Sequence, residues 1–359
     1  MNNDGIRVLY LVRSLKRCGP VNVLFYIIKN LDRNIFSPVV ITFKAEGSDS
    51  RIDDFKALGV EIYSEKNMRQ GIKKIKSILT YKSSKIIVHS HGILPDFVNT
   101  LFNRKNVVNI STIHNKPIED YILTFGKIKG RLLAEIHYFL LRKLKIVSCS
   151  ESVGKSLKEH TRLSYVSIRN GVPFDHKLVT NSRICGREIN VVYVGSLSEL
   201  KNVDFLIKAV LSVVNNNVNL TIVGGGPKYK ILKERYKDEP KIIFVGFKKD
   251  TTVFFQNADV FASSSLSEGL PMAVIESLSF GKPVLLSDIE SHKEIMNQGR
   301  FGKLFKNNNI DSFVHSFQKI IDLVDKEKMI HDNAQPVFSD KVMSKKYQDL
   351  YLMFLNESS

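Results

Sequence analysis

The sequence predicts an α/β protein made of two doubly wound domains, because buried strands alternate with amphipathic helices in two successive series. The strand-like runs are rich in Val and Ile and lack strict apolar–polar alternation, which is typical of parallel strands covered on both faces. A length of 359 residues is more than one ordinary core needs and suits two domains.

The first series of elements occupies the N-terminal half of the chain. Strands are predicted at residues 6–12, 38–43, 85–90, 107–112 and 145–150. Residues 21–31 have the apolar spacing of a helix. We expect residues 1–172 to form one Rossmann-like domain.

The second series follows a polar stretch from about Asn170 to Glu188, the predicted hinge. Strands are predicted at residues 189–196, 218–225, 241–247, 258–265 and 282–288, with helices at 203–214 and 311–324. We expect residues 173–340 to form the second domain. A last helix, within residues 341–359, is expected to pack back onto the first domain.

The formal charge of +17 restricts the choice of partners. Residues 60–172 hold 20 Lys and Arg against 8 Asp and Glu, a surplus of 12. Such a field attracts nucleic acid, an anionic membrane face or phosphorylated substrates, although a lysine-rich solvated surface is the simpler interpretation. Nucleic acid is not expected, because no helix-turn-helix, zinc finger or aromatic-rich RNA motif is present.

The cysteines and the hydropathy pattern bear on the compartment. Cys18, Cys149 and Cys185 have neither metal-ligand nor disulfide spacing, which fits a reducing cytosol. No run approaches the ~20 apolar residues of a membrane span. A cytoplasmic protein, peripheral at the inner face of the plasma membrane, is therefore expected.

The stretch SEGLPMAVIESLSFGKPV, residues 267–284, places two glutamates eight positions apart around a helix start. Pro271 suits the first helical position and Gly281 the position past the end, so residues 272–280 are expected to be helical. Amides at such a helix start attract phosphate. Glu268 and Glu276 are acceptors for sugar hydroxyls, so the spacing suits a nucleotide sugar. The alternative is that Glu276 is an exposed helix residue and that Glu268 only interacts favourably with the helix dipole.

This stretch resembles the signature of retaining glycosyltransferase family 4, which has the two-domain GT-B architecture. VGSLSELKNVDFLI, TIVGGGPKYKIL and ADVFASSSLSEGLP continue the resemblance in family order. The first half adds SLKRCGPVNVLFYIIKNLD, HSHGILPD and STIHNKPIEDY. The resemblance therefore covers nearly the whole chain.

The resemblance implies a role for each matching residue of the second domain. Glu268 would hold hydroxyls of the donor sugar, and Glu276 the ribose hydroxyls. Backbone amides of Gly269 and Leu270 would contact the sugar and its phosphate. Lys201 would neutralise the diphosphate leaving group.

In the first domain, the resemblance makes Gly19 the loop glycine beside the phosphate, with an ordinary turn glycine as the alternative. His114 would lie near the reacting sugar, unless it is a structural histidine at a strand end. Because the chain lacks a D-x-D pair, no metal and no cofactor are expected. His89 and His91 are interpreted as structural or cleft-lining rather than as metal ligands.

Two positions depart from the family pattern. Ser196 stands where an arginine usually contacts the diphosphate, and serine brings no charge. Cys18 stands where the first of two loop glycines is frequent. The first departure leaves open either compensation by another cation or weaker stabilisation of the leaving group.

The resemblance implies a retaining, metal-independent glycosyltransferase. It would move a sugar from a nucleotide sugar, UDP-linked, to a glycan or lipid-linked acceptor in the synthesis of a bacterial surface polysaccharide. An anionic membrane surface is a further expected partner. The alternatives are a GT-B epimerase or phosphorylase, or a non-catalytic donor-binding partner subunit.

Overall fold

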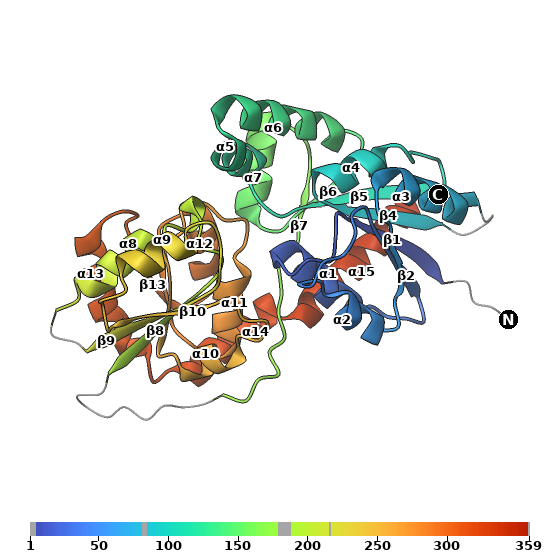
Figure 1. Ribbon diagram of the computed structural model, residues 1–359. Coiled ribbons are helices and arrows are strands. Elements are labelled where there is room, and N and C mark those ends of the chain that lie inside the picture. The colour runs from blue at the N-terminus through green and yellow to red at the C-terminus, as the bar shows by residue number, and fades with distance from the viewer. Residues whose placement is uncertain (1–4, 81–84, 179–187, 215–216, 358–359) are drawn as a thin grey trace. The chain divides into compact units, whose positions relative to one another are not determined.

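The computed structural model describes residues 5–80, 85–178, 188–214 and 217–357, and Figure 1 shows their helices and strands. The chain divides into two compact units. Unit 1 comprises residues 1–171 and 340–359, and unit 2 comprises residues 172–339. The predicted boundaries fall one residue from these positions. Residues 179–187 of the predicted hinge, which include Cys185, lie outside the described residues.

Unit 1 is built on a parallel sheet of seven described strands in the order β3-β2-β1-β4-β5-β6-β7. The strands are β1 Ile6–Val12, β2 Phe36–Thr42, β3 Glu61–Ser64, β4 Ile86–His91, β5 Val107–Ile113, β6 Lys145–Ser148 and β7 Val166–Ser167. Every residue of β4 and β5 is buried, as expected for strands with helices on both faces.

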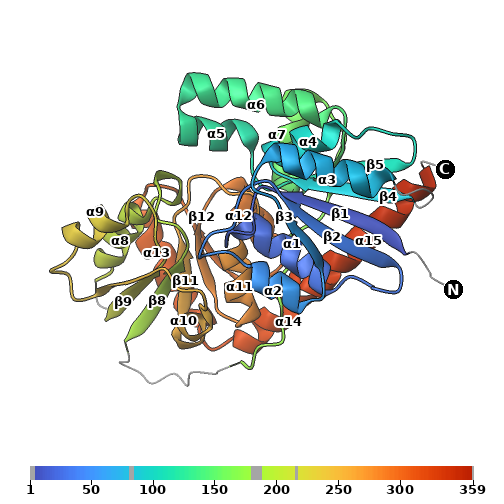
Figure 2. The ribbon, with the colours of Figure 1, turned by 45° about the vertical axis from the view of Figure 1, so that its right-hand side comes forward.

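The helices of unit 1 alternate with these strands, and one more helix comes from the C-terminal part of the chain. They are α1 Gly19–Lys29, α2 Ile52–Ala57, α3 Met68–Thr80, α4 Ile93–Thr100, α5 Pro117–Phe125, α6 Lys127–Leu141, α7 Glu151–Thr161 and α15 Asp340–Glu357. Figure 2 shows α15, in red, beside α1.

Unit 2 is built on a parallel sheet whose six described strands run in the order β10-β9-β8-β11-β12-β13. The strands are β8 Ile189–Val194, β9 Val218–Val223, β10 Ile242–Gly246, β11 Val260–Ser263, β12 Val284–Ser287 and β13 Gly302–Phe305. In order of the chain this is 3-2-1-4-5-6, the doubly wound arrangement of the Rossmann fold. The direction of winding reverses between β8 and β11.

The helices of unit 2 connect successive strands or follow the last one. They are η1 Glu199–Lys201, α8 Val203–Leu211, α9 Tyr229–Arg235, α10 Thr252–Asn257, α11 Met272–Ser279, α12 Glu290–Met296, α13 Ile310–Ile320, η2 Ile321–Leu323 and α14 Glu327–Phe338. The α/β prediction is therefore confirmed for both units. The three strands without a predicted counterpart, β3, β7 and β13, are short edge strands, where burial leaves a weaker pattern.

Helix α15 closes the core of unit 1 with polar contacts as well as apolar ones. The Ser344 hydroxyl donates to the carbonyl oxygen of Ile27 over 2.8 Å. The Tyr351 hydroxyl lies 2.7 Å from Nδ1 of His89 on β4 and donates to the Tyr10 hydroxyl over 3.2 Å. All three rings are fully buried. The C-terminal helix thus supplies hydrogen-bond partners for buried polar side chains of the sheet.

Replacing Tyr351 by Phe tests this dependence. The change leaves Nδ1 of buried His89 without its hydroxyl partner, so we expect the free energy of unfolding to fall by about 1–3 kcal/mol. Urea unfolding followed by circular dichroism measures it. Met353→Ala, at a 44% exposed position of the same helix, should change stability by less than about 0.5 kcal/mol. Equal stability of Tyr351→Phe and the parent chain would contradict the interpretation.

Candidate active site

The loops that follow β8 and β11 meet at the winding reversal of unit 2. Open parallel sheets bind ligands at this edge, outside the carboxyl ends of their strands. Lys201 ends the 3-10 helix η1 in the loop after β8, and Glu268 lies in the loop after β11. The topology therefore brings together two of the predicted site residues that are 67 positions apart in the sequence.

Three hydrogen bonds fix one loop against the other. The Leu266 amide donates to the carbonyl oxygen of Leu200 over 2.8 Å. The Ser264 hydroxyl donates to the carbonyl oxygens of Lys201 at 3.1 Å and Asn202 at 2.8 Å. Asn202 has a left-handed backbone, φ 51°, which separates η1 from α8. The backbone around Lys201 is thus held from the β11 side before any side-chain charge is considered.

The ammonium of Lys201 forms a salt bridge with Oε1 of Glu268. The Ser265 hydroxyl donates to the same oxygen over 2.7 Å. Only 22% of the Lys201 side chain and 12% of the Glu268 side chain are exposed. Burial raises the pKa of the Glu268 carboxyl, but the charge and hydrogen bond of Lys201 outweigh it, and the pKa is lowered below its ordinary value. Glu268 is therefore an anion at neutral pH.

His292 on α12 is a fully buried neighbour of this pair that sequence reasoning missed. Its Nδ1 lies 2.8 Å from the carbonyl oxygen of Ser287, and its Nε2 has no hydrogen-bond partner among the described residues. Burial lowers the pKa of His292 to about 4, although the charge of Glu268 acts in the opposite direction. A neutral imidazole with one unsatisfied nitrogen thus lies in the electrostatic environment of Glu268. No sequence signal marks it, since SHKEI reads as an ordinary helix start.

Helix α11 carries the second glutamate of the predicted pair. It spans Met272–Ser279, with Pro271 as the N-cap rather than the first helical residue, and no side chain caps it. Ile275 and Leu278 are buried as predicted, whereas Met272 is only partly buried because it begins the helix at the surface of the core. Glu276 is partly buried in the second turn. The first-turn amides, which have no partner within a helix, follow directly after the loop of Glu268.

Gly269 and Leu270 occupy the two positions between Glu268 and the N-cap of α11, and both are buried. At the other end of the helix, Gly281 follows the C-cap Phe280 with a left-handed φ of 70°. A Cβ there would lie 2.4 Å from the carbonyl oxygen of Glu327. The glycine therefore ends the helix and permits close contact with α14.

The glycines after β9 serve the backbone of unit 2. A Cβ on Gly224 would lie 1.8 Å from the carbonyl oxygen of Gly195, and one on Gly226 would lie 2.7 Å from that of Leu197. The Leu197 amide donates to the carbonyl oxygen of Gly225 over 2.8 Å. Close approach of the loops after β8 and β9 is the physical reason for this glycine run. Ser196, between those contacts, is exposed, and its carbonyl oxygen accepts from the Tyr193 hydroxyl at 2.9 Å.

The remaining predicted site residues lie in unit 1. Gly19 is the first residue of α1, Pro20 follows it in the first turn, and Cys18 is the exposed N-cap. Cys18 makes no side-chain capping bond and has an extended backbone, φ −161°, which any residue can adopt. The turn before α1 is thus formed here without a glycine at position 18.

His114 follows β5 and pairs with a histidine from β4. Nε2 of His114 lies 2.8 Å from Nδ1 of His91, and the two rings stack with centroids 5.1 Å apart. His89, two residues earlier, has its Nε2 2.7 Å from the Thr112 hydroxyl. Its other nitrogen contacts α15, so His89 is a structural histidine. The ring centroids of His89 and His91 lie 4.4 Å apart. The contact of His91 with His114 was not predicted from the sequence.

Burial is the main cause of the low basicity of these rings. It lowers the pKa of His89 to about 3 and that of His114 to about 4, and it also lowers the pKa of His91. In a bond between two imidazoles one nitrogen must donate and the other accept, which neutral rings can do. Nε2 of His91 has no hydrogen-bond partner in the described part of unit 1.

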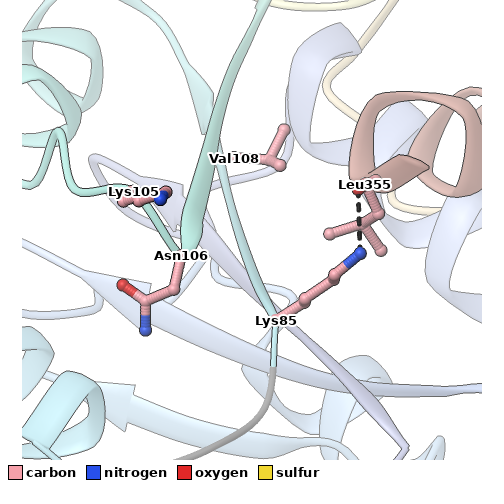
Figure 3. Close-up of a pocket in the computed structure, with 5 residues that line it drawn as sticks. All are labelled: Lys85, Lys105, Asn106, Val108 and Leu355. Atoms are coloured by element: carbon pink, nitrogen blue, oxygen red, sulfur yellow. Dashed lines mark hydrogen bonds between the residues drawn. The ribbon is translucent and has the colours of Figure 1, made fainter. Parts of the chain in front are cut away.

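A cavity elsewhere in unit 1 lies at the amino ends of the strands, opposite the ends that carry the histidines. It has a volume of about 380 Å³ and is lined by Lys85, Lys105, Asn106, Val108 and Leu355. Figure 3 shows the ammonium of Lys85 donating to the carbonyl oxygen of Leu355, over 3.0 Å. These residues surround the amino ends of β4 and β5, so the cavity is remote from the strand ends that carry the histidines. Lys85 satisfies a carbonyl of the last turn of α15.

No helix among the described residues is both long and apolar enough to cross a membrane. Within the same ranges, no three His, Cys, Asp or Glu side chains are grouped as a metal site would require.

Comparison with known sequences gives matches along the whole chain. The family model "Glycosyl transferases group 1" matches residues 178–336, which is nearly all of unit 2. The O-antigen biosynthesis glycosyltransferase WclY of Escherichia coli is 25% identical over 96% of this chain and 98% of its own length. An uncharacterised glycosyltransferase of Methanocaldococcus jannaschii is 26% identical over 84% and 90%.

A third relative matches a shorter region. The E. coli UDP-Gal:α-D-GlcNAc-diphosphoundecaprenol α-1,3-galactosyltransferase is 29% identical over 36% of this chain and 35% of its own length. The chain is thus similar to group 1 glycosyltransferases over nearly all of unit 2 and to curated glycosyltransferases over nearly its whole length.

Comparison with solved structures identifies the fold. Anabaena HepE, solved with UDP and glucose, superposes with a TM-score of 0.79 at 15% identity, covering 97% of this chain and 99% of that one. Sucrose-phosphate synthase of Thermosynechococcus elongatus gives 0.82 at 15% identity, covering 98% and 100%. The predicted GT-B fold is therefore confirmed.

The histidine cluster yields a prediction for the protonation state of His114. Because burial lowers its pKa to about 4, His114 should remain neutral from pH 9 down to about pH 5. A pH titration followed by NMR of the imidazole ring measures this. Free histidine in the same buffer is the reference, with an ordinary imidazole pKa of about 6.5. Protonation of His114 at the pH at which the free amino acid titrates would contradict the buried pairing.

Proposed function

We propose that this protein is a retaining, metal-independent glycosyltransferase that transfers a sugar from a UDP-sugar to a lipid-linked or glycan acceptor in bacterial surface polysaccharide synthesis. The observation that carries the proposal is the largely buried Lys201–Glu268 pair at the winding reversal of a GT-B unit. The loop that carries Glu268 leads directly into α11. The UDP in HepE and the UDP-Gal of the third relative support a UDP-linked donor.

Lys201 would hold the diphosphate of the donor. In the unliganded chain its charge is neutralised by Glu268. An arriving diphosphate is a competing anion, and it replaces the carboxylate as the partner of the ammonium. Glu268 is then available to accept hydrogen bonds from sugar hydroxyls. The ion pair thus keeps both groups charged and in place before the donor arrives, which limits the reorganisation needed on binding.

The other predicted residues of unit 2 would bind further parts of the donor. Amides of Gly269 and Leu270, just before α11, would contact the phosphate and the sugar. Glu276, in the second turn of that helix, would bind the ribose hydroxyls. Unit 1 would bind the acceptor, and the family resemblance assigns two of its residues: His114 as a neutral hydrogen-bonding group for the reacting sugar, and Gly19 as the loop glycine beside the phosphate.

The transfer step needs no covalent enzyme intermediate. The bond from the anomeric carbon to the phosphate oxygen breaks, and the acceptor oxygen forms a new bond on the same face of the sugar. The acceptor hydroxyl proton passes to the departing phosphate. The charge that develops on the diphosphate is stabilised by Lys201, so positioning and electrostatics provide the catalysis.

The acceptor and the location follow from the chemistry of the relatives. WclY is described as acting in O-antigen biosynthesis, and the galactosyltransferase name specifies a diphosphoundecaprenol acceptor. A lipid diphosphate of this kind is confined to a membrane surface. We therefore propose that the protein works as a peripheral protein at the inner face of the plasma membrane.

A donor screen followed by product analysis tests the proposal. Thermal unfolding is measured with UDP-, GDP- and ADP-sugars, and the donor that stabilises the protein is then offered with a lipid-diphosphate acceptor in EDTA. We expect a UDP-sugar to raise the unfolding temperature and the product to keep the anomeric configuration of the donor. An isomerised sugar nucleotide formed without acceptor would indicate an epimerase. Donor binding without any turnover would indicate a non-catalytic subunit.

Substitutions of the charged site residues separate their roles. Lys201→Ala should lower turnover by about 10²–10³, the effect typical of removing one charge-stabilising donor. Glu268→Ala should mainly lower kcat, and Glu276→Ala should mainly weaken donor binding. Steady-state kinetics with calorimetric donor titration distinguish these effects. Lys208→Ala removes an ion pair within α8 whose lysine side chain is 55% exposed, and this variant should leave turnover unchanged. Full activity in the three site variants would refute the assignment.

Ser196 offers a gain-of-function test. Because this residue is exposed, an arginine there adds a cation without burying it. We expect Ser196→Arg to strengthen binding of the nucleotide diphosphate by roughly tenfold, the value of one charge-assisted hydrogen bond. Asn257→Arg, at the amino end of β11, adds the same charge away from the site and should have no effect. Unchanged affinity in Ser196→Arg would place the diphosphate away from this loop.

A further inference from the structure

Helices α5 and α6 of unit 1 form a hairpin with an unusually apolar exposed surface. The two helices run side by side in both views (Figures 1 and 2). Between 46% and 86% of each of six large apolar residues is exposed there: Leu123, Phe125, Ile128, Leu132, Ile136 and Phe139. Contiguous apolar surface of this kind marks an interaction site in a folded protein.

The exposed residues of α6 form a single stripe. Ile128, Leu132, Ile136 and Phe139 are separated by four, four and three positions. At about 100° per residue they fall within an arc of about 80°. The helix buries its opposite side, which carries Ala134, His137 and Leu141. Helix α6 thus has two apolar faces: one packs against the core of unit 1, and the other is directed away from that core.

The hairpin is held rigidly against unit 1. Gly130 of α6 approaches α5 so closely that a Cβ would lie 2.4 Å from the carbonyl oxygen of Tyr121. The Tyr121 hydroxyl lies 2.9 Å from Nδ1 of His137, and Nε2 of His137 lies 2.7 Å from Oδ2 of buried Asp96 on α4. The outward stripe is therefore a fixed part of the fold and not a segment left unpacked.

Cations flank the stripe on both sides. Residues 116–143, which include both helices, contain six basic residues and three acidic ones, a net charge of 6 − 3 = +3. The basic residues are Lys116, Lys127, Lys129, Arg131, Arg142 and Lys143, and the acidic ones are Glu119, Asp120 and Glu135. All of the basic residues except Lys116 are exposed. On the helical projection Lys129 lies to one side of the stripe, whereas Lys127 and Arg131 lie to the other, together with Glu135. An apolar centre with a surplus of basic residues around it is complementary to an anionic lipid surface, with acyl chains below phosphate head groups.

We propose that the outer face of the α5–α6 hairpin binds anionic phospholipid and holds unit 1 on the membrane. This deepens the proposed function and rests on it, since it assigns the surface by which the protein reaches a lipid-linked acceptor. Helix α5 begins three residues after His114, so the membrane contact adjoins the segment that carries this site residue. A symmetric contact between two copies would bring two surfaces of net charge +3 together, and six exposed apolar side chains suit lipid better than nucleic acid.

Vesicle sedimentation tests the assignment. The full-length protein is mixed with phosphatidylglycerol–phosphatidylethanolamine vesicles, and separately with phosphatidylcholine vesicles, without any sugar donor. We expect binding to the anionic vesicles that weakens with added salt, and much weaker binding to the neutral ones. Ile128→Ser/Leu132→Ser should reduce the partition into anionic vesicles by about tenfold or more. Lys127→Gln/Lys129→Gln/Arg131→Gln should reduce it by a similar factor.

A matched control replaces apolar residues that are exposed in unit 2. Ile231→Ser/Val253→Ser alters positions that are 56% and 51% exposed, and it should bind vesicles as the parent chain does. Unfolding temperature and calorimetric binding of the UDP-sugar should be unchanged in all three variants, because they alter exposed side chains. Loss of donor binding in the parent chain would count against the proposed function, whereas vesicle binding is measured independently of it.

Three results would overturn the assignment. The first is equal binding of the parent chain to anionic and neutral vesicles. The second is binding of Ile128→Ser/Leu132→Ser as tight as that of the parent, which would show that diffuse charge alone accounts for the attraction. The third is a dimer in analytical ultracentrifugation that Ile128→Ser/Leu132→Ser dissociates, with no vesicle binding, which would make a second copy the occupant of this face.

Discussion

The contact between Lys201 and Glu268 is the interaction on which the proposed ligand binding of unit 2 depends. Both side chains are largely removed from water, so their attraction is stronger than that of a surface pair. Loss of either partner would leave a buried charge without compensation, a situation that typically costs 3–5 kcal/mol. The pair can therefore be opened only by a ligand that supplies a substitute anion to the lysine. A diphosphate meets this requirement and a neutral sugar does not.

The loops around that contact do not rely on charge for their geometry. Hydrogen bonds from the Leu266 amide and the Ser264 hydroxyl fix the backbone on either side of Lys201. The glycines after β9 let a third loop pack against the same segment. The site is thus preorganised by neutral backbone contacts, and the two charges meet in a frame that already exists. Such a frame lowers the reorganisation cost when a charged ligand binds.

Unit 1 buries polar groups by the opposite method. His89, Thr112, Tyr347 and Tyr351 form a hydrogen-bonded network without a charged member. Burial keeps the imidazole of His89 neutral by lowering its pKa, and it keeps the Tyr351 hydroxyl protonated by raising its pKa. The adjacent His91–His114 pair is also neutral, because for His114 burial outweighs the charge of nearby Asp96. Neutral groups suit a surface that would orient a sugar, whereas the charged pair of unit 2 suits a phosphate.

Much of this was accessible from the sequence. Parallel strands buried on both faces leave continuous Val and Ile runs, so the two sheets and their order of elements could be predicted. That Lys201 and Glu268 serve one site was implied by the family resemblance only, and their salt bridge was not predicted. The contacts of His91 and His292 could not be predicted, because each depends on tertiary packing between strands or helices that are distant in sequence. The outward stripe of α6 was also hidden, since its periodicity alone suggests a face turned toward the core.

The chain order of the two units constrains how the protein is made. Unit 2 lies within unit 1 in the sequence, and α15 follows it. During synthesis the sheet of unit 1 emerges first, but the tyrosines that satisfy His89 and Thr112 emerge only after all of unit 2. The core of nascent unit 1 therefore cannot be completed while unit 2 is being translated, and its polar groups remain hydrated during that time. Completion of the first domain is in this way delayed until the second has had time to fold.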